Sequence, residues 1–164
     1  MTPGQLYPLK ADRVRVAMAW DVDTGGWKGV QRDLDVACVA VNKKGQVDMT
    51  DCIYYGNLEN KSKSIKHSGD NTTGKGDGND ERISLQMREI PNDVYALYFI
   101  LSAAGHNQSL SCLKQAKMRL IDKNTGFGIS RYSSEELCES SNTSFFLMRI
   151  ARNLETGHWY LAPM

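Results

Sequence analysis

The sequence predicts an all-β fold, an antiparallel β-sandwich of two sheets with at most short helices. Short runs rich in β-branched and aromatic residues recur along the 164 residues, and Gly, Asn and Asp cluster between them. No helical segments alternate with these runs, which favours an antiparallel sandwich over a doubly wound sheet. A chain of this length fits one domain with a sizeable core, so residues 1–164 are expected to form a single domain.

Nine segments have the composition of strands, and several of the turns between them have hairpin chemistry. The turn sequences NKKG, NTG and ETG begin at Asn42, Asn124 and Glu155, and strand-like sequence flanks each of them on both sides. The expected strands are 13–20, 34–41, 52–56, 82–87, 94–104, 116–122, 127–132, 143–152 and 158–162. The only helices expected are two short ones, at 109–114 and 133–138.

Charge and hydropathy limit the partners that the sequence supports. Lys and Arg total 20 and Asp and Glu total 19, for a net charge of +1, so no global excess of charge indicates nucleic acid and none is expected as a partner. Any electrostatics that matter are local. No apolar run approaches the roughly 20 residues of a transmembrane helix, and the first residues lack the pattern of a signal peptide. We therefore expect a cytoplasmic protein without a transmembrane segment.

Neither the cysteines nor the histidines are expected to hold a metal. The cysteines are isolated, without a CxxC pair, and are interpreted as buried free thiols. They are Cys38, Cys52, Cys112 and Cys138. The histidines lie far apart near loops and are expected on the surface, and calcium disfavours nitrogen ligands. They are His67, His106 and His158.

The longest polar stretch, residues 57–82, is interpreted as an insertion between two strands and contains the densest group of candidate ligands. Calcium takes six to eight oxygen ligands from carboxylates, amides and carbonyls on a flexible frame. The segment SGDNTTGKGDGNDE, from Ser68 to Glu81, offers such side chains between glycines that let the backbone fold around an ion. Carboxylates crowded together repel one another, so a bound divalent ion is the natural compensation. The candidate side-chain ligands are Asp70, Asn71, Asp77, Asn79, Asp80 and Glu81.

Two other motifs overlap these regions, and both lack part of their pattern. GDNTTGK from Gly69 matches a P-loop, but Gly76 stands where Ser or Thr is required, and no strand-to-helix transition surrounds it. VAMAWDVDT, with Asp21 and Asp23, resembles the nucleophile motif of haloacid dehalogenase-like phosphatases, and GDGND from Gly76 resembles their later acidic motif. A Mg²⁺-dependent phosphohydrolase that uses Asp21 and Asp23 therefore stays open as the enzymatic alternative.

A second acidic element lies at the start of an expected strand. In DLDVACVAV the period of two places Asp33 and Asp35 on one face, with Leu34 and Val36 on the other. Two carboxylates about 7 Å apart along one strand can share a metal with an incoming loop. We therefore add Asp33 and Asp35 to the candidate ligands.

Taken in order, these motifs resemble the TerD domain family of tellurium-resistance and general stress proteins. The resemblance rests on AMAWD at Ala17, DLDVACVAVNKKGQV at Asp33, IYYGNL at Ile53, HSGDNTTGKGDGNDE at His67 and AKMRLID at Ala116. It runs from about residue 4 to the end of the chain. The family pattern has GDN, TG, GDG and DE at this separation from an upstream DLD.

The resemblance implies a β-sandwich that binds one or two Ca²⁺ ions in its acidic loops and has no established catalytic activity. Its members are linked to tellurite and chemical stress, and some eukaryotic members are described as cAMP-binding, so a cAMP-binding variant is a further alternative. A stress-response module of this kind would act through protein partners, which are unknown, or as a sensor or scaffold. Carried over position by position, the implied ligands are Asp33, Asp35, Asp70, Asn71, Asp77, Gly78 through its carbonyl, Asp80 and Glu81. Asn79 departs from the pattern, where an acid is common, and offers an amide oxygen instead.

Overall fold

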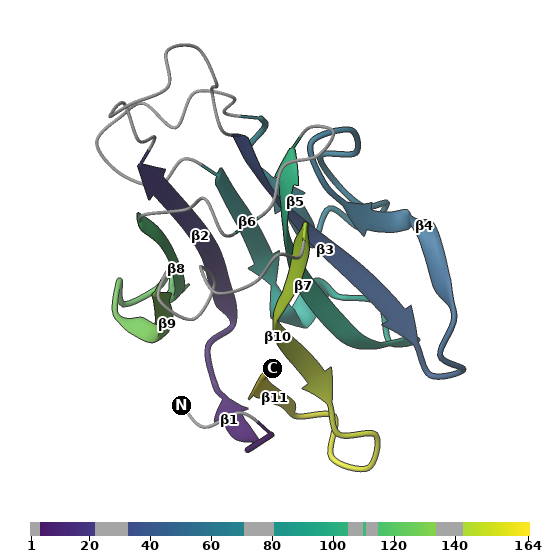
Figure 1. Ribbon diagram of the computed structural model, residues 1–164. Helices are drawn as coiled ribbons and strands as arrows, with labels where there is room; N and C mark the ends of the chain where they lie inside the picture. The colour runs from purple at the N-terminus through teal and green to yellow at the C-terminus, as the bar shows by residue number, and fades with distance from the viewer. Residues whose placement is uncertain (1–3, 22–32, 71–80, 105–109, 111–114, 134–142) are drawn as a thin grey trace, which may run out of the picture.

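The computed structural model describes residues 4–21, 33–70, 81–104, 110, 115–133 and 143–164, and in these residues the fold is built from strands. Two antiparallel sheets pack face to face, as the sequence predicts (Figure 1). The only helical element among the described residues with assigned bounds is one 3₁₀ turn, η1 (Met87–Glu89). No helix in these ranges is long and apolar enough to cross a membrane.

The larger sheet has six strands in the order β1, β11, β10, β7, β3, β4. Their bounds are β1 (Tyr7–Leu9), β11 (Trp159–Pro163), β10 (Ser144–Arg152), β7 (Val94–Ala104), β3 (Asp33–Asn42) and β4 (Val47–Ile53). Every neighbouring pair is antiparallel. The long strands β3 and β7 pair from Asp33↔Ala104 to Asn42↔Val94 and form the centre of this sheet.

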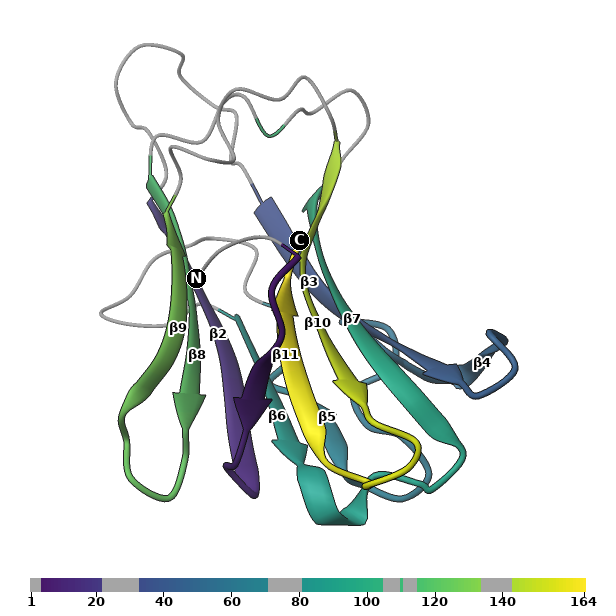
Figure 2. The same ribbon diagram turned by 90° about the horizontal axis from the view of Figure 1, so that it is seen from below.

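The smaller sheet has five strands in the order β5, β6, β2, β8, β9. Their bounds are β5 (Ile65–His67), β6 (Glu81–Gln86), β2 (Arg13–Asp21), β8 (Gln115–Asp122) and β9 (Gly128–Ser133). In Figure 2, β8 and β9 lie on one side of the molecule and β7 and β4 on the other. β2 ends and β3 begins at the same end of the sandwich (Figures 1 and 2).

The core follows from the alternation of side chains along each strand. Val14, Val16 and Met18 of β2 are buried, while Arg13 and Arg15, which alternate with them, point to the outer face. On the larger sheet, Leu97, Phe99 and Leu101 of β7 are completely buried in the same way. The inward faces of the two sheets therefore form one continuous apolar layer, as in other aligned sandwiches.

The three hairpin turns expected from the sequence are confirmed. They connect β3 to β4, β8 to β9 and β10 to β11. Each contains a glycine with a positive φ, namely Gly45 (75°), Gly126 (78°) and Gly157 (71°). A residue with a Cβ is disfavoured at these angles, which is why the turns carry glycine.

Three short or peripheral strands differ from the sequence prediction. β1 and β5 have only three residues each and were not expected, and β5 lies inside the stretch interpreted as a polar insertion. The strand expected at 52–56 ends at Ile53, because Tyr54 and Asn57 close a tight turn. Residues 47–53 instead form the edge strand β4. Its first four residues are all exposed and alternate between apolar and polar side chains. Of the helices expected at 109–114 and 133–138, almost all residues lie outside the described ranges.

Candidate metal site

Three carboxylates from separate segments meet at one end of the sandwich. Asp35 lies in β3, Asp70 follows β5 and Glu81 begins β6, and one oxygen atom from each lies within 4.8 Å of the other two. Asp70 is exposed, Asp35 is half-buried and Glu81 is completely buried. The group therefore extends from the solvent into the interior, between β3 of one sheet and β5 and β6 of the other (Figure 1).

The β5–β6 hairpin places Asp70 beside Glu81. Its ladder runs from Ile65↔Leu85 to His67↔Ile83 and is extended by Ser68, whose N–H donates to Arg82 O (2.8 Å) and whose Oγ accepts from Arg82 N–H (3.0 Å). Gly69 then has a φ of 99°, an angle that residues with a Cβ rarely adopt. The glycine-rich segment 71–80 connects Asp70 to Glu81, so these two residues flank its two ends.

The buried edge of β3 binds Glu81 and His67 from the opposite sheet. The β3–β4 ladder reaches Cys38↔Ile53, and β4 ends there, so it does not extend to Val36. The Val36 N–H instead donates to Glu81 Oε2 (2.9 Å), and His67 Nε2 lies 3.2 Å from Val36 O. Two polar side chains of the smaller sheet thus satisfy the backbone of the larger one, at a position where no strand among the described residues pairs with this edge of β3.

Glu81 is the residue that most needs a cation. Its side chain is 0% exposed, and its Oε1 has no hydrogen-bond partner among the described residues. An ionised carboxylate in such a place costs several kcal/mol unless a positive charge compensates it. Asp35 and Asp70 add further negative charge within 4.8 Å. The donor set therefore suits a hard cation, which binds carboxylate oxygens directly.

His67 does not supply that positive charge. Its Nε2 lies 3.4 Å from Glu81 Oε2, but its Nδ1 accepts a hydrogen bond from the Gly69 N–H (3.0 Å) and therefore carries no proton. This hydrogen-bond network assigns the neutral imidazole with the proton on Nε2, directed at Val36 O and Glu81. His67 is thus a neutral donor that fixes the carboxylate and the chain leading to Asp70.

The prediction that His67 lies on the surface is wrong. The residue is 7% exposed and its side chain is completely buried, whereas His158 is exposed as expected and His106 lies outside the described residues. The sequence did hold a signal: in IKH the period of two places His67 on the same face as Ile65, which is completely buried. A strand of three residues is too short for this period of two to be recognised in the sequence.

The structure brings together three of the nine residues predicted to bind the metal, namely Asp35, Asp70 and Glu81. The backbone of Asp33 begins β3 as expected, with Leu34 and Val36 buried on the inner face, but its side chain is not described. The remaining candidates lie outside the described residues; they are Asn71, Asp77, Gly78, Asn79 and Asp80.

Two of the cysteines fit the prediction of buried free thiols. Cys38 is 0% exposed and Cys52 is 6% exposed, and neither forms a disulfide. Burial raises the pKa of both thiols, most strongly that of Cys38, so both are held in the unreactive protonated form. Cys112 and Cys138 lie outside the described residues. The two described thiols are therefore not suited to direct chemistry with tellurite.

Comparison with known proteins identifies the family. The TerD domain matches residues 1–164, the whole chain. The chain is 29% identical over 149 residues to tellurium resistance protein TerD of an Alcaligenes species, covering 89% of this chain and 76% of that protein. It is 28% identical over 128 residues to general stress protein 16U of Bacillus subtilis, covering 76% and 66%. A solved homologue of telluride resistance protein (TerD) from Streptomyces coelicolor has the same fold, with a TM-score of 0.74 at 13% identity over 93% of this chain and 88% of that one.

The enzymatic and cAMP-binding alternatives gain no support from these findings. A haloacid dehalogenase-like phosphatase needs strands that alternate with helices, and the described residues instead form two antiparallel sheets. Asp21 ends β2, but its side chain is not described, and Asp23 lies outside the described residues. The match over the complete chain, the relatives and the shared fold agree with the resemblance seen in the sequence motifs. The chain belongs to the TerD domain family.

Proposed function

We propose that the protein is a non-enzymatic calcium-binding module of the stress response. A Ca²⁺ ion is held between Asp35, Asp70 and Glu81, where the acidic loop meets β3. Further oxygen ligands, and those of a second ion where one binds, come from the other candidates that the sequence supplies. These are Asp33, Asn71, Asp77, Gly78, Asn79 and Asp80. The module works in the cytoplasm through protein partners, as a sensor or scaffold.

One observation carries this proposal: the completely buried Glu81 has an oxygen without a hydrogen-bond partner in the described residues, beside two other carboxylates. A structural glutamate would have both oxygens satisfied by donors, as buried polar groups usually are. Glu81 Oε2 accepts from Val36 N–H, so the side chain is fixed in place, while Oε1 is left for a ligand that is positively charged.

Calcium fits this site better than magnesium. Calcium accepts six to eight oxygens in variable geometry, including amide and backbone carbonyl oxygens, whereas magnesium requires a near-ideal octahedron and keeps several waters. The sequence around the site offers many carboxylate and amide oxygens between glycines, which is a flexible frame. The proposal therefore predicts a response that is selective for calcium.

Bound calcium would join the two sheets at this end of the sandwich. Asp35 belongs to the larger sheet and Glu81 to the smaller one, so an ion shared by both carboxylates adds a cross-sheet link to the hydrogen bonds at Val36. Because the ion binds the folded protein, it stabilises that state by RT ln(1 + [L]/Kd), about 2.7 kcal/mol at a hundredfold excess over Kd. For a chain of this size that corresponds to roughly 5 to 10 °C in Tm.

The test is thermal unfolding of the chelated protein with Ca²⁺ or Mg²⁺ added back. Asp70→Ala should abolish most of the calcium-dependent rise in Tm, because it removes an exposed ligand without disturbing the buried hydrogen bonds at Val36. Asp93→Ala is the matched control, since Asp93 is an exposed acid that precedes β7 at the opposite end of the sandwich. Equal shifts with calcium and magnesium, or a full calcium shift in Asp70→Ala, would contradict the proposal.

A further inference from the structure

The outer face of the five-stranded sheet carries a dense set of positive side chains. The inward positions of these strands form the core, so the alternating positions face outward. Eight of the 20 basic residues of the chain share this one face, although the net charge of the whole chain is only +1. They are Arg13, Arg15, Lys66, Arg82, Lys117, Arg119, Lys123 and Arg131. We call this set the basic face.

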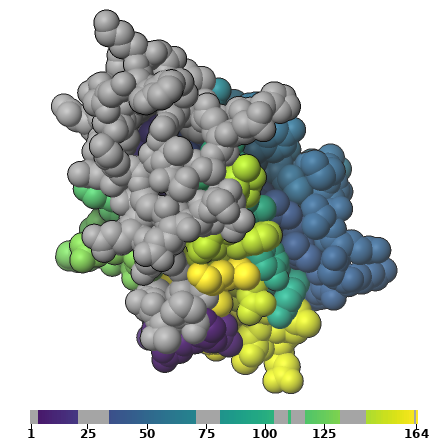
Figure 3. Space-filling model, viewed as in Figure 1, coloured from purple at the N-terminus to yellow at the C-terminus, as the bar shows by residue number. Residues whose placement is uncertain are grey.

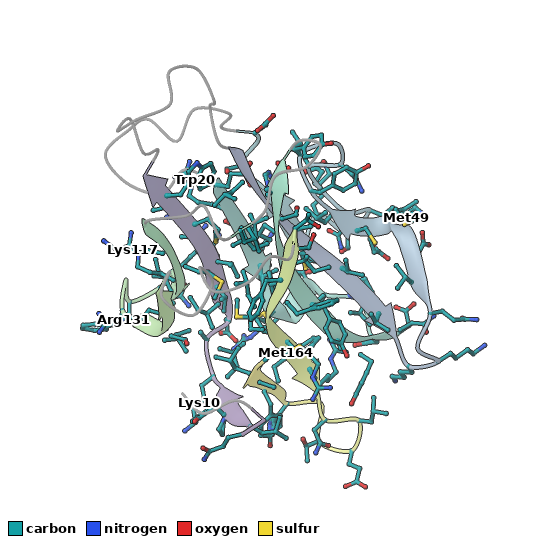
Figure 4. All side chains as sticks on the ribbon, in the orientation of Figure 1. Lys10, Trp20, Met49, Lys117, Arg131 and Met164 are labelled. Carbon is teal, nitrogen blue, oxygen red and sulfur yellow. The ribbon has the colours of Figure 1, made fainter. Side chains whose placement is uncertain are left out.

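The strand register places these cations in adjacent rows. Ala17 of β2 pairs with Arg82 on one side and with Arg119 on the other, and Arg119 pairs directly with Arg131 of β9. Like charges at directly opposite positions are destabilising. In Figure 4 the labelled Lys117 and Arg131 both extend from the β8–β9 flank away from the sandwich. These rows gather positive charge on one surface, which suits a ligand of negative charge.

A hollow at one corner of the basic face concentrates the charge further. Arg13, Lys66, Lys123 and Lys63 line a cavity of about 220 Å³ together with Ser84. Burial and the proximity of Arg15 and Arg13 lower the pKa of Lys123, as expected where cations crowd one another. Lys66 and Lys63 share one carboxylate, that of Glu59, at 3.1 and 3.9 Å. The hollow is large enough for a phosphate group and is lined mainly by donors.

None of the outward positions of these five strands with a described side chain is acidic. Most of the described side chains among the cations are small or polar, such as Ala17, Ala19, Ser84 and Gln86, although the half-buried Ile121 of β8 lies opposite Arg15 on the same face. With strand spacings of about 4.8 Å and a rise of about 3.3 Å per residue, the face measures roughly 20 Å in each direction. It is an extended platform, and its ligand should be an extended polyanion.

We propose that the basic face binds the phosphate backbone of duplex nucleic acid. Double-stranded DNA has one negative charge per roughly 1.7 Å of axis, so the face spans about 12 phosphates. Five of the eight cations are Arg, whose planar guanidinium donates two parallel hydrogen bonds to one phosphate. Among the described outward side chains of the five strands none is aromatic, and the exposed Phe127 lies in the adjoining β8–β9 turn, so the face has no row of aromatic rings for stacking single-stranded bases. Ile121 is apolar but stands alone among these side chains, so it does not form a group that would enter a membrane.

The net charge of +1 does not show how the charges are distributed over the surface. The near-neutral composition gave no reason to expect nucleic acid, because 19 acidic residues balance the 20 basic ones over the whole chain. The fold gathers Asp35, Asp70 and Glu81 at one end of the sandwich and places the eight cations on the outer face of the smaller sheet. Binding at the basic face does not depend on the calcium site.

The test is fluorescence anisotropy of a labelled DNA duplex of about 20 base pairs, titrated with the full-length protein. Non-specific binding through phosphates has a Kd of about 1 to 100 µM, and with about six phosphate contacts it should weaken at least about a thousandfold between 50 and 200 mM salt. Arg119→Gln with Arg131→Gln removes two contacts, so the slope of log K against log [salt] should become less steep by about 1.8.

A matched variant separates the basic face from net charge. Lys43→Gln with Lys44→Gln removes the same two charges from the exposed β3–β4 turn, on the flank opposite β8 and β9 (Figure 3). It should leave the affinity and the salt slope unchanged. A second basic-face variant, Lys66→Gln with Lys123→Gln at the corner hollow, should weaken binding like the first, and thermal unfolding checks that each variant is folded.

Three results would overturn the proposal. The first is no duplex binding at about 100 µM protein in low salt, the upper end of the non-specific range. The second is an equal loss of affinity in the basic-face and β3–β4 variants, which would show an effect of net charge alone. The third is binding to phosphatidylserine vesicles without binding to the duplex, which would assign the basic face to a membrane surface.

Discussion

The two charged regions of this protein differ in their access to water. At the candidate metal site the Glu81 carboxylate is completely buried between two sheets, with one oxygen bonded to Val36 N–H. On the basic face, residues such as Lys117, Arg119 and Arg131 are exposed to solvent. A charge in the interior has a high desolvation cost and needs an opposite charge placed directly beside it. Exposed charges are screened by water and salt, so many of them must contact a ligand together to bind it.

This difference explains why the two regions suit different ligands. The metal site has few charges in a fixed geometry, so a single small cation can satisfy it. The basic face has many charges over a wide area, and only an extended polyanion can contact most of them at once. Substitutions at the buried site should therefore have large effects on stability, and substitutions on the face small ones.

The largest effect is expected from Glu81→Gln. The amide keeps an oxygen that can accept from Val36 N–H but removes the buried charge, so the calcium-free protein should gain stability, because desolvation of a buried ion costs several kcal/mol. The same change removes a calcium ligand, so the calcium-dependent rise in stability should largely disappear. Chemical denaturation with chelator and with calcium measures both effects.

Glu59→Gln is the control for this variant, because Glu59 is an exposed carboxylate that pairs with Lys63 and Lys66. It should change stability by less than about 0.5 kcal/mol with or without calcium. If Glu81→Gln instead destabilises the chelated protein as strongly as the calcium-loaded one, Glu81 is a structural hydrogen-bonding residue and the buried-charge argument fails.

His67→Phe should have the opposite effect and destabilise the protein. The ring keeps most of the buried volume but removes the donor near Val36 O and the acceptor of the Gly69 N–H, and each buried group left without a partner costs about 1 to 3 kcal/mol. Calcium affinity should also fall, because Gly69 leads directly to Asp70. Unfolding in chelator measures the first effect, and calcium titration followed by intrinsic fluorescence measures the second.

His158→Phe is the matched change at an exposed histidine and should shift stability by no more than about 0.5 kcal/mol. Equal stabilities for the two variants would mean that the hydrogen bonds of His67 contribute nothing to the folded state. A loss of stability in His67→Phe without any change in calcium affinity would separate its structural role from the metal site.

The smallest effect is expected from Arg131→Gln on the basic face. Arg131 lies directly opposite Arg119, and removing one of two facing like charges should stabilise the protein by about 0.2 to 1 kcal/mol at low salt. High salt screens the repulsion and should remove the gain. Lys44→Gln, in the exposed β3–β4 turn, should show no such salt-dependent gain, and destabilisation by Arg131→Gln at low salt would contradict like-charge crowding on this face.

The long strands and their turns could be predicted because their signals are local. Val14, Val16 and Met18 alternate with outward residues along β2, and glycine marks the turns of three hairpins. β5 could not be predicted in the same way, because three residues are too few to show a period. The end of β4 at Ile53 depends on a turn that Tyr54 and Asn57 close, which composition alone does not reveal.

The sequence predicted which residue types form the candidate metal site, but it did not predict the contacts that these residues make. Asp70 and Glu81 stand out by their spacing among glycines, and Asp35 by its place in DLD. The period of two places Glu81 on the inward face with Ile83 and Leu85, but it does not show that Glu81 or His67 would meet Val36, because residue 36 is 31 positions from residue 67. Contacts between different sheets depend on how the sheets pack, which is a long-range property.

By itself, the sequence determined the alternation of side chains along the strands, the hairpin turns, the candidate oxygen ligands and the net charge of +1. These follow from the residue types and from the order of neighbouring residues along the chain. Only the tertiary structure decided which carboxylate is buried and where the cations gather. Packing the two sheets put Glu81 at an edge of β3 beyond the end of β4, and pairing β2, β6, β8 and β9 aligned arginines that are distant in sequence. Burial and strand register depend on contacts between strands. They therefore set the free-energy cost of each charge, whereas the sequence sets only its sign.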